Sequence, residues 1–252
     1  MSKIKLFCLL GLPGVGKGTL AEHFHVCDGF MKISTGDIFR EEAKKDTIEG
    51  REIKDMLDRG LFMPDHMVCD VIKRHLDGIR KIAKSGKSDL EIRNVFDGFP
   101  RSPMQADFII NWAQDNSDIV DFGGLVLITN VIDSKLRERL EHRLTCDKCG
   151  TTCFDMGPGY EERISQFKNS PLLYLYEATA EGKTCKLPWC GGKLYRRSDD
   201  SPELVKARTA SMNAYLPTVC MRAALRDVLH VVDGLQTPLD IYLEARRRIG
   251  IL

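Results

Sequence analysis

The sequence predicts an α/β protein in which a parallel β-sheet is flanked by helices on both faces. Short, nearly continuous apolar runs recur along the chain and alternate with helical patterns, as in successive strand–helix–strand units. A glycine-rich turn follows the first apolar run directly and leads into a helical pattern. Between about residues 145 and 195 this alternation stops, and glycines, prolines and cysteines become frequent. A small separate insertion is expected there.

The first apolar run, residues 4–10, contains one charged residue, Lys5, and is typical of a central strand buried on both faces. The last helix has a clear start, because Thr237 suits the N-cap, Pro238 suits the first helical position and Asp240 would complete a capping box. The other predicted strands are residues 30–33, 95–96, 125–128 and 228–232. The helical patterns between them include residues 18–25, 65–76 and 134–143.

Composition limits the classes of function. The 252 residues carry a net charge of +1 from 37 basic and 36 acidic groups. This balance gives no support to broad binding of nucleic acid or anionic membranes. No apolar stretch approaches the ~20 residues that span a bilayer, and the N-terminus shows no signal-peptide pattern. We expect a cytoplasmic monomer, with an organellar location left open, whose nine cysteines are mostly reduced thiols.

The glycine-rich turn at residues 11–19, with the sequence GLPGVGKGT, predicts a phosphate-binding loop. Glycines allow successive backbone N–H groups to turn toward phosphate oxygens, and a helix N-terminus adds positive potential. Lys17 supplies a mobile charge for the β- and γ-phosphates. The general P-loop has Ser or Thr directly after the lysine, whereas here Gly18 intervenes and Thr19 carries the hydroxyl. The alternative is a glycine-rich turn with a surface lysine. The loop residues predicted to contact the phosphates of ATP are Gly14, Val15, Gly16, Lys17, Gly18 and Thr19.

Further motifs occur along the chain in a recognisable order. They are ISTGDIFR at residues 33–40, GLFMPD at residues 60–65 and DGFPR at residues 97–101. With the loop form GxPGxGKGT, they give the chain a resemblance to the adenylate kinases, from Gly11 to the C-terminal helix. The resemblance implies reversible phosphoryl transfer from ATP-Mg to AMP, giving two ADP. It implies a P-loop NTPase-type core of residues 1–144 and 196–252, an acceptor-nucleotide-binding segment within residues 34–76, and a lid at residues 145–195.

The same resemblance implies roles on the acceptor side. Arg101 would bind the AMP phosphate, and Asp97 would lie near the magnesium ion and act through its waters. Gln105 would recognise adenine, since an amide both donates to and accepts from this base; the alternative is a solvated helix residue. The implied AMP-binding residues are Thr35, Arg40, Met63, Gly98, Arg101, Gln105, Arg197 and Arg208.

Arginines flank the predicted lid. Phosphoryl transfer depends mainly on positioning and on neutralising charge on the transferring oxygens, so several cations should meet at one point. Arg139 and Arg143 are spaced to share one face of the predicted helix. The resemblance implies that Arg139 lies against the ATP base, that the other lid-flanking arginines bind phosphates, and that two acids brace them. The alternative for each arginine is an exposed helix position. The implied catalytic set is Lys17, Arg101, Arg139, Arg143, Arg197, Arg208, Asp199 and Asp200.

Two cysteine pairs within the lid favour a structural zinc site. Cys146 and Cys149 are separated by two residues, and Cys185 and Cys190 by four, which suits a tetrahedral thiolate site. Lids of this family that carry zinc usually have two residues between both pairs. The alternative is a lid held by packing around four reduced cysteines, with Cys153 as a possible substitute ligand. The long stretch between the pairs includes residues 174–176, which could fold over the zinc or pack elsewhere.

Two alternative functions remain open. The chain could phosphorylate another nucleoside monophosphate, or use GTP as the donor; Gln105 favours AMP, whereas Arg139 could stack on either purine. A function of a different class, a zinc-containing nucleic-acid-binding module with a vestigial P-loop, predicts a basic face with interleaved aromatic residues.

Overall fold

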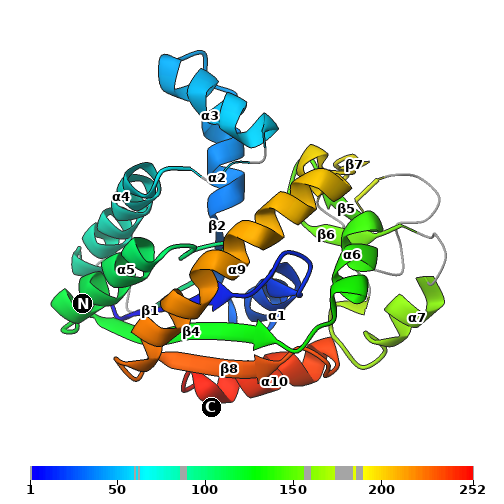
Figure 1. Cartoon of the computed structure of the whole chain (residues 1–252). Coiled ribbons are helices and arrows are strands. Elements are labelled where there is room, and N and C mark those ends of the chain that lie inside the picture. Colours follow the sequence, from blue (N-terminus) through cyan, green and yellow to red (C-terminus); the bar gives the residue numbers. More distant parts are fainter. Residues whose placement is uncertain are drawn as a thin grey trace.

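The computed structural model describes residues 2–59, 61, 63–85, 90–155, 160–173, 184–185 and 190–251. Residues 174–176, and Gly60 and Phe62 of the predicted turn at residues 60–65, lie outside the described residues. Within the described ranges, one five-stranded sheet and one three-stranded sheet are formed (Figure 1). No helix of these ranges is long and apolar enough to cross a membrane.

The five-stranded sheet is parallel throughout and has the order β2-β3-β1-β4-β8. All five predicted strands are confirmed, and β3 and β4 are longer than predicted, because polar residues and glycines at their ends hide the apolar pattern. With β1 in the centre, the segments that follow β2 and β3 lie on one side of it and the segment that follows β8 lies on the other. The strands are β1 Ile4–Leu10, β2 Met31–Ser34, β3 Ile92–Asp97, β4 Val120–Thr129 and β8 Leu229–Asp233.

Strand β1 is apolar on both faces because both faces of the sheet are covered. Leu6 and Cys8 belong to the core on one face, and Phe7 and Leu9 to the core on the other. Successive side chains of a strand point to opposite faces, so alternate residues of β1 contribute to the two cores. The first core is covered by α4 (Asp65–Lys84), α5 (Pro103–Asp115) and α9 (Pro202–Ala224), and the second by α1 (Lys17–Asp28) and α10 (Pro238–Arg248).

A cluster of aromatic rings joins β1, α1 and α10 in the second core. The Phe7 and Phe24 ring centroids are 4.6 Å apart, and Phe24 also meets Phe30 and Tyr242 edge to face. The Tyr242 hydroxyl donates a hydrogen bond of 2.6 Å to Asp28 at the end of α1. This packing fixes the helix that begins at the predicted phosphate-binding loop.

Two helices follow β2 and project beyond the sheet (Figure 1). Ser34 caps α2 (Thr35–Glu42) by accepting a hydrogen bond from the Asp37 N–H, and Thr47 caps α3 (Ile48–Asp58) by accepting from the Gly50 N–H. Together with the start of α4, these helices make up most of the predicted acceptor segment.

The small sheet is antiparallel, has the order β6-β5-β7, and corrects one prediction. The prediction of a single helix over residues 134–143 is wrong. Helix α6 (Asp133–Glu141) ends before Arg143, and Arg143 begins β5 (Arg143–Cys146). The helix ends there because Arg143 pairs with Phe154 and the Asp155 N–H donates to the His142 carbonyl. Arg139 and Arg143 therefore lie on different elements. The remaining elements of this region are β6 (Thr152–Phe154), α7 (Tyr160–Ser165) and β7 (Leu194–Tyr195).

Replacing Phe24 by Ala should remove the centre of the aromatic cluster. We expect the free energy of unfolding to fall by about 3–5 kcal/mol, the usual cost of truncating a buried phenylalanine. The matched control is Val26→Ala on the exposed side of the same helix, where a change within about 0.5 kcal/mol is expected. Urea unfolding measures both. Equal losses in the two variants would contradict the assignment of Phe24 to the core.

Candidate active site

The predicted phosphate-binding loop connects β1 to α1 and has the backbone that phosphate binding requires. Gly11, Gly14 and Gly16 have φ values of 133°, 81° and 110°, in the left-handed region that side chains disfavour. A Cβ atom at Gly11 would also lie 2.8 Å from the Ile128 carbonyl oxygen. The side chain of Lys17 folds back over the loop and donates to the carbonyls of Gly11 and Leu12 at 2.8 and 2.9 Å. The loop therefore presents the N-terminus of α1 and one ammonium group to the same space.

A single pocket extends from this loop along the carboxyl ends of β1, β2 and β3, where ligands of parallel sheets bind. All of the predicted ATP-contacting loop residues line it. Most of the other predicted residues line it as well: Arg40, Asp97, Gly98, Arg101, Arg139, Arg143, Arg197, Asp199 and Arg208.

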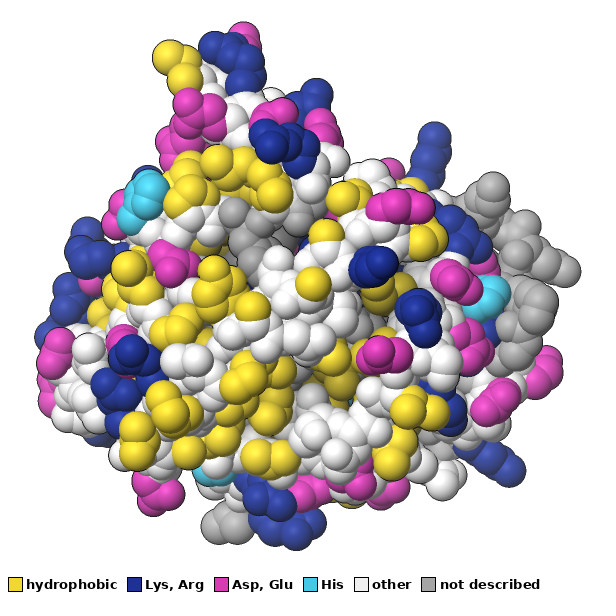
Figure 2. Space-filling model, viewed as in Figure 1, with side chains coloured by type: hydrophobic (Ala, Val, Ile, Leu, Met, Phe, Trp, Pro, Cys, Tyr) yellow, Lys and Arg dark blue, Asp and Glu magenta, His cyan; other side chains and the backbone are white. Residues whose placement is uncertain are grey.

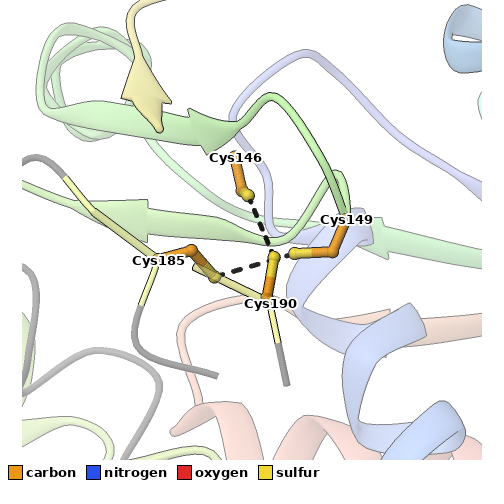
Figure 3. A group of neighbouring side chains, drawn as sticks. All are labelled: Cys146, Cys149, Cys185 and Cys190. Carbon is orange, nitrogen blue, oxygen red and sulfur yellow. Dashed lines mark hydrogen bonds between the residues drawn. The ribbon is translucent and has the colours of Figure 1, made fainter. Parts of the chain in front are cut away.

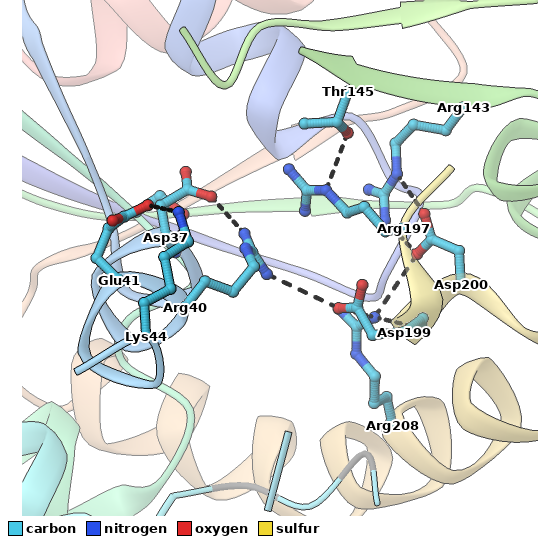
Figure 4. Close-up of polar contacts among 11 residues, drawn as sticks. Asp37, Arg40, Glu41, Lys44, Arg143, Thr145, Arg197, Asp199, Asp200 and Arg208 are labelled. Carbon is cyan, nitrogen blue, oxygen red and sulfur yellow. Dashed lines mark hydrogen bonds and ion pairs between the residues drawn. The ribbon is translucent and has the colours of Figure 1, made fainter. Parts of the chain in front are cut away.

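The arginines reach the pocket from elements far apart in the sequence, and acidic side chains hold them (Figure 4). Arg143 of β5 donates through Nε to Asp200 at 2.9 Å. Arg208 of α9 donates to the side chain and the carbonyl of Asp199, both at 3.0 Å. The Arg40 guanidinium contacts the same Asp199 carboxylate at 4.0 Å from the opposite side. One carboxylate thus lies between an arginine of α2 and an arginine of α9.

Arg197 is held differently. Its Nε donates to the Thr145 hydroxyl at 2.9 Å, which leaves the other guanidinium nitrogens toward the pocket (Figure 4). Arg101 donates through Nε to the Gly98 carbonyl at 2.7 Å. Arg197 and Arg101, like Arg143 and Arg208, are therefore aimed by fixed acceptors before any phosphate binds, which is the preorganisation that phosphoryl transfer uses.

Burial and neighbouring charges shift the pKa values of several side chains in this site. Burial lowers the pKa of Lys17 to about 8; the Asp97 carboxylate opposes this change, and Arg101, Arg208 and Arg143 add to it. Burial, together with Arg208, also lowers the pKa of Arg101 to about 10. For Asp199, burial acts to raise the pKa, but the surrounding arginines outweigh it and hold the pKa below its usual value. The pocket therefore holds more positive charge than it can stabilise alone, and it favours a polyanion.

Asp97 fits the predicted indirect contact with magnesium. Its carboxylate lies close to the first turn of α1, 3.6 Å from the position of a Cβ atom at Gly18. Magnesium keeps several of its waters and is bound through one or two carboxylates together with substrate phosphates. A single carboxylate beside the phosphate-binding loop matches that donor set.

Three predicted acceptor residues do not line the pocket. Thr35 donates its hydroxyl to the Gly98 carbonyl at 3.0 Å, and Met63 packs in the core. Gln105 is buried; its oxygen accepts from the Arg101 N–H at 2.8 Å, and its nitrogen donates to Asp65 at 2.7 Å. The Gln105 amide is thus engaged within the protein, and its recognition of adenine stays a prediction.

The pocket also contains residues that sequence reasoning missed. The pocket is lined after β8 by Gln236, Pro238 and Ile241. The sequence signal that could have identified them is the predicted helix start directly after a parallel strand, because ligands bind at the carboxyl ends of such strands. Arg163, Gln166 and Phe167 line the pocket from the region of α7. No motif marks these three residues, because their place depends on how the insertion folds.

The four predicted zinc ligands converge in the small sheet (Figure 3). All four sulfur atoms lie within 4.8 Å of one another, with Cys146–Cys190 at 3.5 Å and Cys149–Cys185 at 3.7 Å. A tetrahedral Zn²⁺ with 2.3 Å bonds to sulfur places its ligands about 3.8 Å apart. The residues therefore fit zinc. Cys153 lies outside the group, with its sulfur 3.9 Å from the Leu144 carbonyl. All nine cysteines lie within the described ranges, and none of them forms a disulfide.

The fold and the phosphate-binding loop together define a P-loop nucleotide kinase. A family model described as "Adenylate kinase" matches residues 9–219. The chain is 30% identical to the adenylate kinase of Caldicellulosiruptor bescii over 243 residues, which cover 96% of this chain and 98% of that protein. It is 31% identical to the adenylate kinase of Bacillus subtilis over 243 residues, covering 96% of both chains. The chain belongs to the adenylate kinase family.

Replacing Cys146 by Ser should lower the zinc content and the stability of the small sheet while leaving the phosphate-binding loop intact. We expect zinc affinity to fall at least about 10-fold, measured as zinc per chain and by competition with a chromogenic chelator. Cys220→Ser, a cysteine outside the group, is the matched control. A wild-type chain purified without zinc, and unable to bind added zinc, would contradict the assignment.

Binding of ATP to the free enzyme should weaken as the pH rises through about 8. The phosphates bind the cationic form of Lys17, and this form is lost above its lowered pKa. Between pH 7.5 and 9 we expect the Kd to rise roughly 5- to 10-fold. Lys17→Arg, which keeps its charge throughout this window, is the control and should give a flatter profile in titration calorimetry. The same slope in both proteins would exclude Lys17 as the titrating group.

Proposed function

We propose that this protein catalyses reversible phosphoryl transfer from ATP-Mg to AMP, giving two ADP. The observation that carries the proposal is the convergence of Lys17 and a set of preorganised arginines on one pocket beside a phosphate-binding loop. This arrangement suits two phosphate chains that meet end to end. Membership of the adenylate kinase family supports the same reaction.

The two nucleotides would occupy opposite ends of the pocket. The triphosphate of the donor would lie on residues 11–19, with its base toward Arg139 and Pro238, because β8 ends on that side of β1. The phosphate of the acceptor would lie between Arg40 and Arg101, because β2 and β3 end on the other side. The γ-phosphoryl group would therefore be transferred above the centre of the sheet.

The chain's own groups would act by position and charge. A phosphate oxygen of AMP attacks the γ-phosphorus, and the bond from this phosphorus to the β–γ bridging oxygen breaks. Lys17, Arg143, Arg197 and Arg208 would stabilise charge on the transferring oxygens, and the transition state needs little help from a general base. Magnesium bound with ATP, near Asp97, would neutralise part of the phosphate charge.

Closure of the lid would complete the site. Arg143 and Arg197 flank the small sheet, so movement of this sheet toward the sheet of the core would carry both guanidiniums onto the phosphates. Closure would also exclude water, which would otherwise accept the phosphoryl group. We propose residues 145–195 as the lid and residues 34–76 as the acceptor segment.

The charge distribution favours small nucleotides over nucleic acid as partners. On the face in Figure 2, lysines and arginines are scattered among aspartates and glutamates and form no continuous basic surface. The arginines of the site instead line one pocket, where Arg143 and Arg208 pair with acidic side chains. We further propose that the protein works as a monomer in a reducing compartment such as the cytoplasm, which suits nine free thiols. Gel filtration tests the oligomeric state.

An activity assay with a panel of donor and acceptor nucleotides tests the function. AMP, GMP, CMP and UMP are offered as acceptors with ATP and with GTP as donors, and the products are separated by ion-exchange chromatography. Formation of ADP from ATP and AMP is expected at the highest kcat/KM. Phosphorylation of UMP or CMP without phosphorylation of AMP would reject AMP as the acceptor.

Replacing Lys17 by Ala should slow the reaction with little effect on folding. We expect kcat to fall by at least ~10²-fold, the usual scale for loss of one preorganised charge donor. Lys135→Ala, an exposed lysine of α6 outside the pocket, should leave kcat unchanged. Near wild-type turnover in Lys17→Ala would mean that Lys17 has no catalytic role.

A further inference from the structure

The segment after β6 forms part of the pocket wall. Arg163, Gln166 and Phe167 come from α7 and the residues just after it, and they line the same pocket as the phosphate-binding loop. This segment belongs to the enlarged part of the predicted lid, and none of the motifs of the family falls on it.

This part of the wall, residues 163–167, lies at the end of the pocket that we propose for the donor nucleotide. The Arg163 side chain contacts Glu138 of α6 at 3.5 Å and donates to the Asp155 carbonyl at 3.3 Å. The same end is lined by Gln236 and Pro238, which follow β8. Strand β8 lies on the opposite side of β1 from β2 and β3, the strands that lead to the acceptor side. The segment is therefore placed to meet the base of the donor nucleotide.

Contacts on two sides hold this wall in place. Ser170 forms a buried hydrogen bond of 2.8 Å with the His23 ring of α1, which belongs to the core. Phe167 and Leu172 pack among the four cysteines of the small sheet. The chain around Gln166 is therefore held at Phe167, directly after it, and at Arg163, which contacts Glu138 of α6, and selective recognition requires such support.

One polar side chain of the wall is available for hydrogen bonds to a base. The Arg163 guanidinium is engaged with Glu138 and Asp155, and the Gln236 amide nitrogen donates to Glu244 at 2.7 Å. Gln166 is half-buried, and no described residue hydrogen-bonds its side-chain amide. Arg139 presents a planar cation, which suits stacking on either purine. Gln166 is therefore the side chain of this segment that can discriminate between bases.

We propose that Gln166 selects adenine as the base of the donor nucleotide. Its oxygen accepts a hydrogen bond from the 6-amino group, and its nitrogen donates to N7, a pairing that glutamine makes with adenine elsewhere. Guanine and hypoxanthine present acceptors at both O6 and N7, so in either orientation of the amide the Gln166 oxygen would face another acceptor. The inference rests on the proposed function, because it takes this pocket to bind the phosphoryl donor.

The test compares donors with AMP as the fixed acceptor. In Gln166→Met, which keeps the size of the side chain, kcat/KM for ATP should fall about 10-fold, the scale of two lost neutral hydrogen bonds. Activity with ITP and GTP should change less than about 2-fold, and the KM for AMP should stay the same. Gln114→Met, an exposed glutamine of α5, is the matched control.

A second variant separates the role of the oxygen. Gln166→Glu keeps an acceptor for the 6-amino group, so its preference for ATP over ITP should stay above that of Gln166→Met. An unchanged ATP-to-ITP preference in Gln166→Met, or a lower preference in Gln166→Glu than in Gln166→Met, would overturn the inference. Failure of the wild type to phosphorylate AMP from ATP would instead reject the proposed function.

Discussion

Mutual repulsion among buried cations is the constraint on which the rest of the site depends. Lys17 and the guanidiniums of Arg101, Arg143 and Arg208 share one pocket, where burial weakens their hydration and lowers the pKa of Lys17 to about 8. Such a cluster is stable without ligand only if fixed anions and carbonyls hold each cation. Asp199, Asp200 and the carbonyls of the loop supply these contacts. A polyphosphate would then replace the repulsion with attraction.

The parallel sheet makes this concentration of charge possible. β1, β2 and β3 end at the same edge, so the phosphate-binding loop, α2 and Asp97 meet although they are far apart in the sequence. The two apolar cores hold the sheet rigid from both faces. The positions of the phosphate-binding groups therefore follow from the register of buried strands, which resists small displacements.

The cysteine group has a mechanical link to the active site. β5 carries Arg143 at its first residue and Cys146 at its last, and Thr145 between them accepts the hydrogen bond from Arg197. A metal bound by the four sulfurs would fix one end of this short strand. Two arginines of the site would thus be positioned by a group that takes no part in phosphoryl transfer.

The sequence by itself determined the strands of the parallel sheet, the phosphate-binding loop, six of the arginines that line the pocket and the four cysteines that converge beside the small sheet. Local signals were sufficient there: continuous apolar runs mark buried strands, and glycine spacing marks a loop whose φ values exclude other residues. Only the tertiary structure decided that Arg143 begins a strand, because its pairing with Phe154 ends the helix. It also decided that the Gln105 amide is engaged by Asp65, and that Gln166 lines the pocket. These three facts depend on contacts between distant segments, and no local pattern of residues encodes them.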